Sequence, residues 1–205
     1  SEMCIRDSPD TGYELPELRV HEEVVSVDNS TAGADRDGQV KMFREAALGL
    51  ADAAKERRDN MQEKIARVVE IINRPENKDD HFLLWHDLEA EREALCKAIP
   101  GCKAVYGSQD DKEADKVIAD FKDGRLKYLA AKPEMLGEGL NFQYHCHKAI
   151  MFIDYRFNDK FQAIARIYRF MQQHPVDLYL VYAESEGEIY KLSLIHISEP
   201  TRRRG

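Results

Sequence analysis

The sequence predicts an α/β fold in which a parallel sheet of about five strands carries helices on both faces. After residue 75, short apolar runs of strand length alternate with amphipathic stretches of helical length. Strands that alternate with helices favour a parallel sheet with right-handed crossovers. The chain has 205 residues, 43% hydrophobic and 33% charged, and a mean hydropathy of -0.58. This composition is sufficient for one soluble domain with its own core, plus accessory segments.

An N-terminal strand and a long helical segment are expected to precede this sheet. Residues 19–28 alternate in a way that predicts a strand with both faces partly covered. Residues 28–38 are polar and contain glycine, which indicates a loop or linker. Residues 40–73 have a helical composition with a break near Gly49. The second half of that segment has an apolar stripe that should pack on a core: Met61, Ile65, Val68, Val69 and Ile72.

The sheet itself is predicted from five apolar runs, at residues 81–85, 103–106, 126–131, 149–153 and 177–182. Helices are expected at residues 88–98 and 109–122 and around Gln162, with Asp87, Ser108 and Asn158 as their N-caps. Residues 132–147 form a loop that contains Gly and Pro. Ligands of such sheets bind at the loops that leave the carboxyl ends of the strands. Those loops contain Trp85-His86, Gly107-Ser108, residues 132–139 and residues 155–158.

Two aromatic residues at the first of these strand ends have alternative interpretations. Trp85 could stack on a nucleic-acid strand, but a Trp that ends a buried strand belongs more often to the core. His86 fits a solvent-exposed position as well as an interface.

The segment from Gln162 to Arg169 is the most informative part of the sequence. If it is helical, Gln162, Arg166 and Arg169 share one face, because they are spaced i, i+4 and i+7. The apolar residues Ile164, Ile167, Tyr168 and Met171 would then lie on the side that faces a core. One amide and two guanidinium groups in line form a fixed set of donors for phosphate oxygens. The alternative interpretation is a solvated charged face with ordinary salt bridges.

Four motifs in this order resemble the second RecA-like domain of superfamily-two helicases. They are Phe82-Leu83-Leu84-Trp85, Tyr106-Gly107-Ser108, Gly137-Glu138-Gly139-Leu140-Asn141 and the segment from Gln162 to Arg169. The resemblance covers residues 81–182 and is closest to the SWI/SNF-type branch found in bacterial and phage proteins, where a Lys-Pro pair like Lys132-Pro133 precedes the glycine motif. It implies a RecA-like fold and part of an ATP-driven helicase or translocase.

The resemblance also implies roles for individual residues. Arg166 and Arg169 correspond to the arginines that stabilise the charge on the transferred phosphoryl group of ATP. The residues expected to face the nucleotide are Gln162, Gly137, Gly139 and Asn141. Asn141 has an alternative interpretation as a residue that stabilises its own loop.

Nucleic acid, either DNA or RNA, is expected along the other rim of the domain, with Ser108 and Lys132 contacting its backbone. Ser108 is equally consistent with a helix cap. The chain departs from the family at Ala131, where Thr or Ser is usual, and at Arg169-Phe170-Met171-Gln172, where the family has Arg-x-Gly-Gln. Neither departure removes a charged residue.

The sequence contains no phosphate loop of the form Gly-x-x-x-x-Gly-Lys-[Ser/Thr] and no Asp-Glu box after an upstream strand. The resemblance therefore implies that ATP and Mg²⁺ are held mainly by a first RecA-like domain of a longer protein. Residues 1–8 and 192–205 resemble translated sequencing-adapter sequence and are left out of the fold. We expect a linker strand and helical segment at residues 9–75 and the RecA-like domain at residues 76–191.

The composition excludes several other classes. The net charge of -8 argues against nucleic-acid binding over the whole surface but allows a local basic groove. No apolar run approaches the roughly 18 residues of a membrane span. The cysteines Cys4, Cys96, Cys102 and Cys146 lack the spacing of a zinc site, and His145-Cys146-His147 has no second ligand pair. We expect no metal in this chain and a reducing, cytoplasmic setting.

Two other function classes stay open. One is a non-catalytic α/β module that binds nucleotide or protein and needs no partner motor domain. The other is a glycosyl- or phosphate-transfer enzyme, for which Asp154 and Asp159 are the only cluster that could serve. That reading leaves Gln162, Arg166 and Arg169 without a role.

Overall fold

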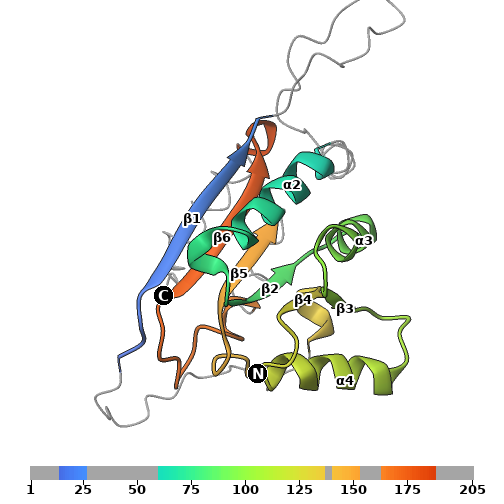
Figure 1. Ribbon diagram of the computed structural model, residues 1–205, viewed down its shortest axis with the longest axis vertical. Helices are drawn as coiled ribbons and strands as arrows, with labels where there is room; N and C mark the ends of the chain where they lie inside the picture. Colours follow the sequence, from blue (N-terminus) through green and yellow to red (C-terminus); the bar gives the residue numbers. More distant parts are fainter. Residues whose placement is uncertain (1–13, 27–59, 137–139, 153–162, 188–205) are drawn as a thin grey trace, which may run out of the picture.

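A computed structural model describes residues 14–26, 60–136, 140–152 and 163–187 of the chain. They form one six-stranded sheet in the order β1-β6-β5-β2-β4-β3, and each pair of neighbouring strands is parallel (Figure 1). The strands are β1 (Leu18–Val25), β2 (His81–Trp85), β3 (Lys103–Val105), β4 (Tyr128–Ala131), β5 (Cys146–Phe152) and β6 (Val176–Ala183). The predicted α/β fold class with a parallel sheet is confirmed.

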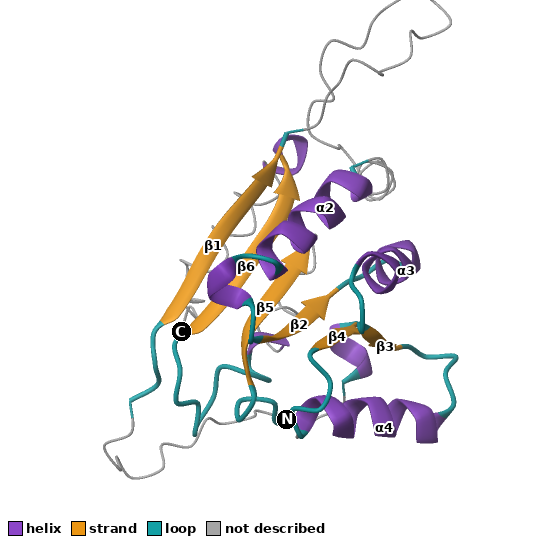
Figure 2. Cartoon of the chain, in the orientation of Figure 1, coloured by secondary structure: helices purple, strands orange, loops and turns teal. Residues whose placement is uncertain are grey.

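The helices of the described residues are α2 (Met61–Ile72), α3 (Glu89–Ala98) and α4 (Asp111–Lys122), and Figure 2 shows their places around the sheet. Short 3-10 turns lie at Pro75–Asn77, Pro133–Met135 and Glu184–Glu186. The regular crossovers are β2-α3-β3 and β3-α4-β4, which carry the chain to the β3 edge and then back toward the centre.

Alternation along the strands divides the core into two layers. Phe82 and Leu84 of β2 pack with the apolar residues of α2 and α3, whereas Leu83 and Trp85 face α4 and the segment after residue 163. Successive side chains of a strand point to opposite faces, so a strand covered on both sides becomes a continuous apolar run. Trp85 is buried in this core, as the sequence favoured.

The N-terminal strand belongs to the same sheet. β1 pairs in parallel with β6, in a register from Leu18 with Val176 to Val25 with Ala183. α2 then covers one face, and its apolar stripe is buried as predicted at Ile65, Val68 and Ile72. A buried ion pair between Lys64 and Glu186, 2.8 Å from Nζ to Oε1, fixes α2 to the end of β6.

Two predicted helix caps are wrong. The Glu91 carboxylate turns back and accepts hydrogen bonds from the backbone N–H groups of Asp87 and Leu88, each at 2.9 Å. Leu88 is therefore the N-cap of α3, and Asp87 lies outside it. The N-cap of α4 is Asp110, because the chain makes a turn through Ser108 before the helix starts. β5 also starts earlier than predicted, at Cys146 instead of residue 149, which shortens the preceding loop.

Candidate functional site

The carboxyl ends of β2, β4 and β3 meet at one edge of the sheet. Parallel pairing sets Trp85 beside Ala131 and Ala131 beside Val105. The residues that follow these strand ends, His86, Lys132 and Ser108, are therefore gathered on one rim, which we call the strand-end rim. The prediction that these loops share an edge is confirmed.

Lys132 is ion-paired on the strand-end rim. Its Nζ lies 3.0 Å from Oε1 of Glu89, in the first turn of α3, and its side chain is 25% exposed. The hydrogen bond from Lys132 lowers the pKa of Glu89. The other oxygen of Glu89 lies 3.1 Å from Nε of Arg92. Glu89 thus neutralises Lys132 and shares its charge with Arg92.

Ser108 is an exposed residue of the turn after β3. The backbone N–H of the next residue, Gln109, donates to the carbonyl of Tyr106 at 3.1 Å and closes this turn. Since Ser108 does not cap α4, its hydroxyl is available to a ligand on the rim. Contact of Ser108 and Lys132 with nucleic acid stays a prediction.

His86 is buried beneath the strand-end rim, with only 3% of its surface exposed. Neither ring nitrogen has a hydrogen-bond partner among the described residues. Burial lowers the pKa of His86 to about 4, so the imidazole is neutral at pH 7. Its burial excludes the solvent-exposed alternative and leaves an unpartnered imidazole close to Lys132.

The second predicted region joins two segments that are distant in sequence. Nη1 of Arg169 donates a hydrogen bond to Oδ1 of Asn141. The backbone N–H of Phe142 donates to the carbonyl of Arg166 at 3.1 Å, and Nη2 of Arg166 donates to the carbonyl of Leu136 at 3.1 Å. The loop that ends in Leu140-Asn141 and the arginine segment therefore form one unit, which we call the arginine loop.

The prediction that Arg166 and Arg169 share a helix face is wrong. Among the described residues the helix includes only Ala163 and Ile164, and turns follow. The carbonyl of Arg166 accepts from Phe142, and the carbonyl of Ile167 accepts from Nε2 of Gln172 at 3.0 Å. These bonds occupy carbonyls that a longer helix would use for its own N–H groups, so tertiary contacts end the helix.

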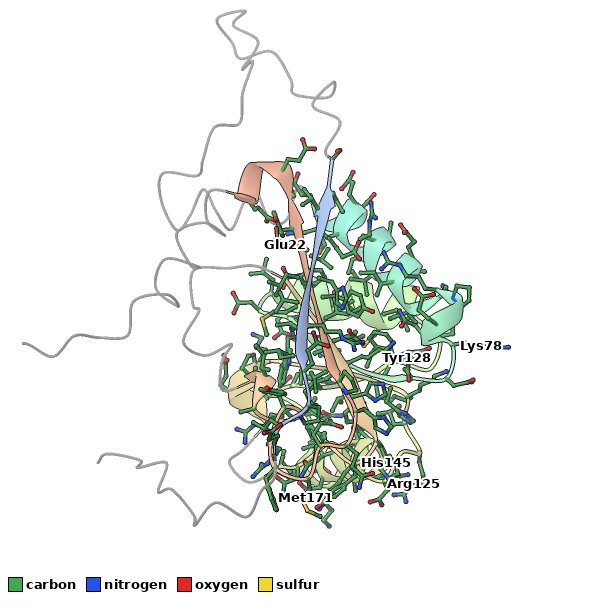
Figure 3. All side chains as sticks on the ribbon, turned by 90° about the vertical axis from the view of Figure 1, so that its left-hand side faces the viewer. Glu22, Lys78, Arg125, Tyr128, His145 and Met171 are labelled. Carbon is green, nitrogen blue, oxygen red and sulfur yellow. The ribbon has the colours of Figure 1, made fainter. Side chains whose placement is uncertain are left out.

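The prediction that the apolar residues of the arginine loop face the core is confirmed only in part. Ile164, Ile167 and Tyr168 pack against the core layer that contains Trp85. Met171 does not, because its backbone is left-handed, with φ 72°, and its side chain is 44% exposed. In Figure 3, Met171 lies toward the opposite end of the sheet from Glu22 of β1.

Among the described residues, Arg166 and Arg169 have only neutral partners. No carboxylate in the described residues forms an ion pair with Arg166 or Arg169, and their hydrogen bonds go to a backbone carbonyl and an amide. Nε of Arg166 is buried without a partner in the described part. The alternative of an ordinary salt-bridged face therefore finds no support there. Two positive guanidinium groups oriented by neutral oxygens are suited to an anion with several oxygens.

The remaining predicted residues of the nucleotide set lie outside the described residues: Gln162, Gly137 and Gly139. The same holds for the Asn158 cap and for the Asp154 and Asp159 pair.

In residues 14–26, 60–136, 140–152 and 163–187, no group of three or more His, Cys, Asp or Glu is placed to hold a metal ion. Cys146 is buried at the start of β5, and burial raises the pKa of its thiol to about 12. Across the same residues, every helix is too short or too polar to cross a membrane.

Sequence reasoning missed one residue of the strand-end rim and one pair of thiols. The sequence pattern places Glu89 only within the helix predicted at residues 88–98, although the first turn of a helix is a position where a carboxylate is favoured. The spacing of Cys96 and Cys102 does not fit a zinc site, so the metal argument does not single out this pair. The signal for their proximity is the turn dipeptide Pro100-Gly101 between them, which predicts that the chain reverses and brings the two cysteines close together.

Comparison with known proteins yields similarity at the level of structure only. No family model and no curated protein matches the sequence. One similar solved structure is the C-terminal part of the Fun30 ATPase domain, with a TM-score of 0.57 and 16% identity over 64% of this chain and 45% of that chain. Another is a Saccharomyces cerevisiae Dbp5 variant bound to a Gle1 variant and IP6, with a TM-score of 0.55 and 12% identity over 89% of this chain and 39% of that chain.

These similarities identify the fold. The chain spans less than half the length of either solved structure that it matches. At this level of identity the likeness is one of architecture, and it does not transfer an activity. The six-stranded parallel sheet with helices on both faces is a RecA-like α/β fold.

Proposed function

We propose that this chain is the C-terminal motor half of an ATP-driven nucleic-acid helicase or translocase. The proposal is supported by the order of its motifs on a RecA-like fold and by the likeness to the C-terminal part of the Fun30 ATPase domain. The observation that carries it is the arginine loop. Arg166 and Arg169 are held by the neutral oxygens of Leu136 and Asn141 and have no carboxylate partner in the described residues.

This arrangement suits the demands of phosphoryl transfer. ATP with Mg²⁺ supplies a γ-phosphoryl group whose oxygens carry the charge of the transition state. Arg166 and Arg169 act as arginine fingers that stabilise this charge across a cleft. Because the partners found in the described residues are neutral, the guanidinium groups are oriented while their charge stays available. Asn141 positions Arg169, and Gln162, Gly137 and Gly139 complete the nucleotide-facing set.

The donor set of this chain fits phosphate and leaves the metal to another domain. Guanidinium groups donate hydrogen bonds and cannot ligate a cation. Mg²⁺ requires carboxylate and phosphate oxygens, and the described residues have no suitable cluster of acidic side chains. We assign Mg²⁺ and most ATP contacts to a first RecA-like domain of the same protein, the partner that Arg166 and Arg169 would face.

The strand-end rim is the proposed contact for the backbone of DNA or RNA. Ser108 offers an exposed hydroxyl. Lys132 offers an ammonium group that a phosphate could bind in place of the Glu89 carboxylate. Contacts of this kind position a strand without reading its sequence. The SWI/SNF-type branch of bacteria and phages, and a cytoplasmic setting, are parts of this proposal that rest on the sequence motifs.

The first test is the ATPase activity of the protein encoded by the complete reading frame. A longer read of the locus should add a phosphate loop and an Asp-Glu box upstream. We expect hydrolysis that single-stranded DNA or RNA stimulates. Binding of nucleotide or protein without any turnover would overturn the motor proposal and favour a non-catalytic α/β module.

A further inference from the structure

Cys96 and Cys102 lie close together at the edge of the sheet that β3 forms. Cys96 is in the last part of α3, and Cys102 immediately precedes β3. The chain between them turns through Pro100 and Gly101, and Gly101 has a positive φ of 80°. This turn brings the two Sγ atoms to 3.9 Å from each other. Both thiols are free.

A surface pocket of about 460 Å³ gives access to this pair of thiols. Both cysteines line it, together with Arg92, Lys103 and Tyr106. Cys96 is half-buried, whereas Cys102 is only 8% exposed. A small reagent can therefore reach Cys96 from the pocket more readily than it reaches Cys102.

The electrostatic surroundings make the two thiols unequal. The hydrogen bond between the two thiols, together with the charges of Arg92 and Lys103, lowers the pKa of Cys96 to about 7. The same hydrogen bond and burial raise the pKa of Cys102. The guanidinium of Arg92 is held in place over the ring of Tyr106, 4.0 Å from its centroid. Cys96 is thus the nucleophile of the pair, because the thiolate is the reactive form of cysteine.

We propose that Cys96 and Cys102 form a reversible dithiol–disulfide site that reacts with hydroperoxides, with Cys96 as the attacking thiol and Cys102 as the resolving thiol. This inference does not rest on the proposed motor function. It depends on the distance between the two sulfurs, on the pocket that exposes Cys96 and on the fixed cation beside it.

The reaction balances with a hydroperoxide as the oxidant. The Cys96 thiolate attacks the peroxide oxygen, the O–O bond breaks, and Cys96 becomes a sulfenic acid while hydroxide leaves and is protonated. Cys102 then attacks the Cys96 sulfur, the S–O bond breaks, and the hydroxide that leaves takes the thiol proton of Cys102 as water. Each disulfide formed oxidises the two sulfurs by two electrons and reduces one peroxide. The Sγ atoms must approach to about 2.05 Å, which is a small movement from their present contact.

The experiment treats the reduced 205-residue chain with one equivalent of hydrogen peroxide at pH 7. The product is blocked with iodoacetamide, digested with trypsin without reduction and measured by mass spectrometry. Trypsin cuts at Lys97, so Cys96 and Cys102 fall in separate peptides, residues 93–97 and 98–103. We expect these peptides to appear as a linked pair, two hydrogens lighter than their sum, and to separate after reduction.

Two variants and one internal control make the test decisive. Cys102→Ser should leave Cys96 as a sulfenic acid that dimedone captures, whereas Cys96→Ser should leave Cys102 unlabelled. Cys146, which is buried, should stay reduced throughout. The proposal is overturned if the linked pair does not form, if dimedone labels Cys102 in Cys96→Ser, or if Cys96 and Cys146 are oxidised at equal rates.

Discussion

The arginine loop and the strand-end rim hold their cations in opposite ways. In the arginine loop, the partners of Arg166 and Arg169 within the described part of the chain are the neutral oxygens of Leu136 and Asn141. On the rim, Lys132 is paired with Glu89 at 3.0 Å. The first region keeps its positive charge available, whereas the second neutralises it.

This difference would give the two proposed phosphate sites different modes of binding. A phosphate at the arginine loop would meet oriented donors without displacing a carboxylate, which is the kind of preorganised electrostatics that catalysis needs. A phosphate at Lys132 must first replace Glu89. That ion pair is partly exposed, and such pairs contribute only about 0–1 kcal/mol. The rim is therefore suited to contacts that form and break along a strand.

The largest expected effect tests the arginine loop. In the complete protein, Arg169→Ala should lower kcat for ATP hydrolysis by about 10³-fold or more, because an arginine finger acts mainly on the transition state. Nucleotide affinity should change much less. Steady-state ATPase kinetics and equilibrium nucleotide binding measure the two quantities separately.

A matched control is Arg125→Ala, which removes a guanidinium that is paired with Asp120 and Asp123 on the surface. Its kcat should stay within about twofold of the wild type, as surface substitutions away from functional features have small effects. If Arg169→Ala and Arg125→Ala give the same kcat, the arginine loop has no catalytic role, and its unpaired charges need another explanation.

The sequence predicted the features that depend on local pattern. The apolar runs at β2, β4 and β6 identified strands, and the alternation at β1 identified a further one. The expectation that both faces of β1 are partly covered is wrong, because Val20, Glu22 and Val24 lie on one face and are exposed. Parallel topology then placed Ser108 and Lys132 on one edge. These predictions succeeded because hydrophobic periodicity and crossover handedness are set by the chain itself.

The features that depend on distant contacts were not predictable in this way. The spacing that predicts a helix continues beyond Ile164, where the helix ends. The carbonyl of Arg166 accepts from the N–H of Phe142 instead, and the carbonyl of Ile167 accepts from the side chain of Gln172. The start of α3 differs for a local reason, because Glu91 accepts from the backbone N–H groups of Asp87 and of the N-cap residue Leu88. A single-sequence pattern does not record which distant donor will compete for a backbone acceptor.

A smaller effect should arise from His86, the neutral neighbour of Lys132 on the strand-end rim. Its pKa of about 4 lies below the ordinary value of 6.5, so the unfolded chain binds a proton more readily than the folded one. Stability therefore falls as pH decreases through this window. Between pH 7 and pH 5 the loss from this group should be about 2 kcal/mol in the free energy of unfolding.

Urea unfolding of the wild type and of His86→Gln at both pH values measures this contribution. The substitution should reduce the decrease in stability between pH 7 and pH 5 by about 2 kcal/mol, whatever its effect at pH 7. Equal decreases in the two proteins would show that His86 is not protected from protonation. The rim would then gain a second cation in mild acid and would resemble the arginine loop more closely.

The smallest expected effect concerns the ion pair itself. Glu89→Gln removes the negative charge beside Lys132 but keeps a side chain of similar size. It should strengthen the binding of a single-stranded oligonucleotide a few-fold at low salt, because phosphate no longer competes with a carboxylate worth about 0–1 kcal/mol.

Fluorescence anisotropy over a salt series separates this effect from a general change in charge. Lys132→Ala should weaken binding and reduce the salt dependence, since one phosphate contact is lost. In the Lys132→Ala background, Glu89→Gln should add much less affinity than it does in the wild type. An equal gain in both backgrounds would mean that Glu89 acts by long-range repulsion only. In that case the rim does not bind strands through Lys132, and the contrast with the arginine loop concerns local structure rather than ligand binding.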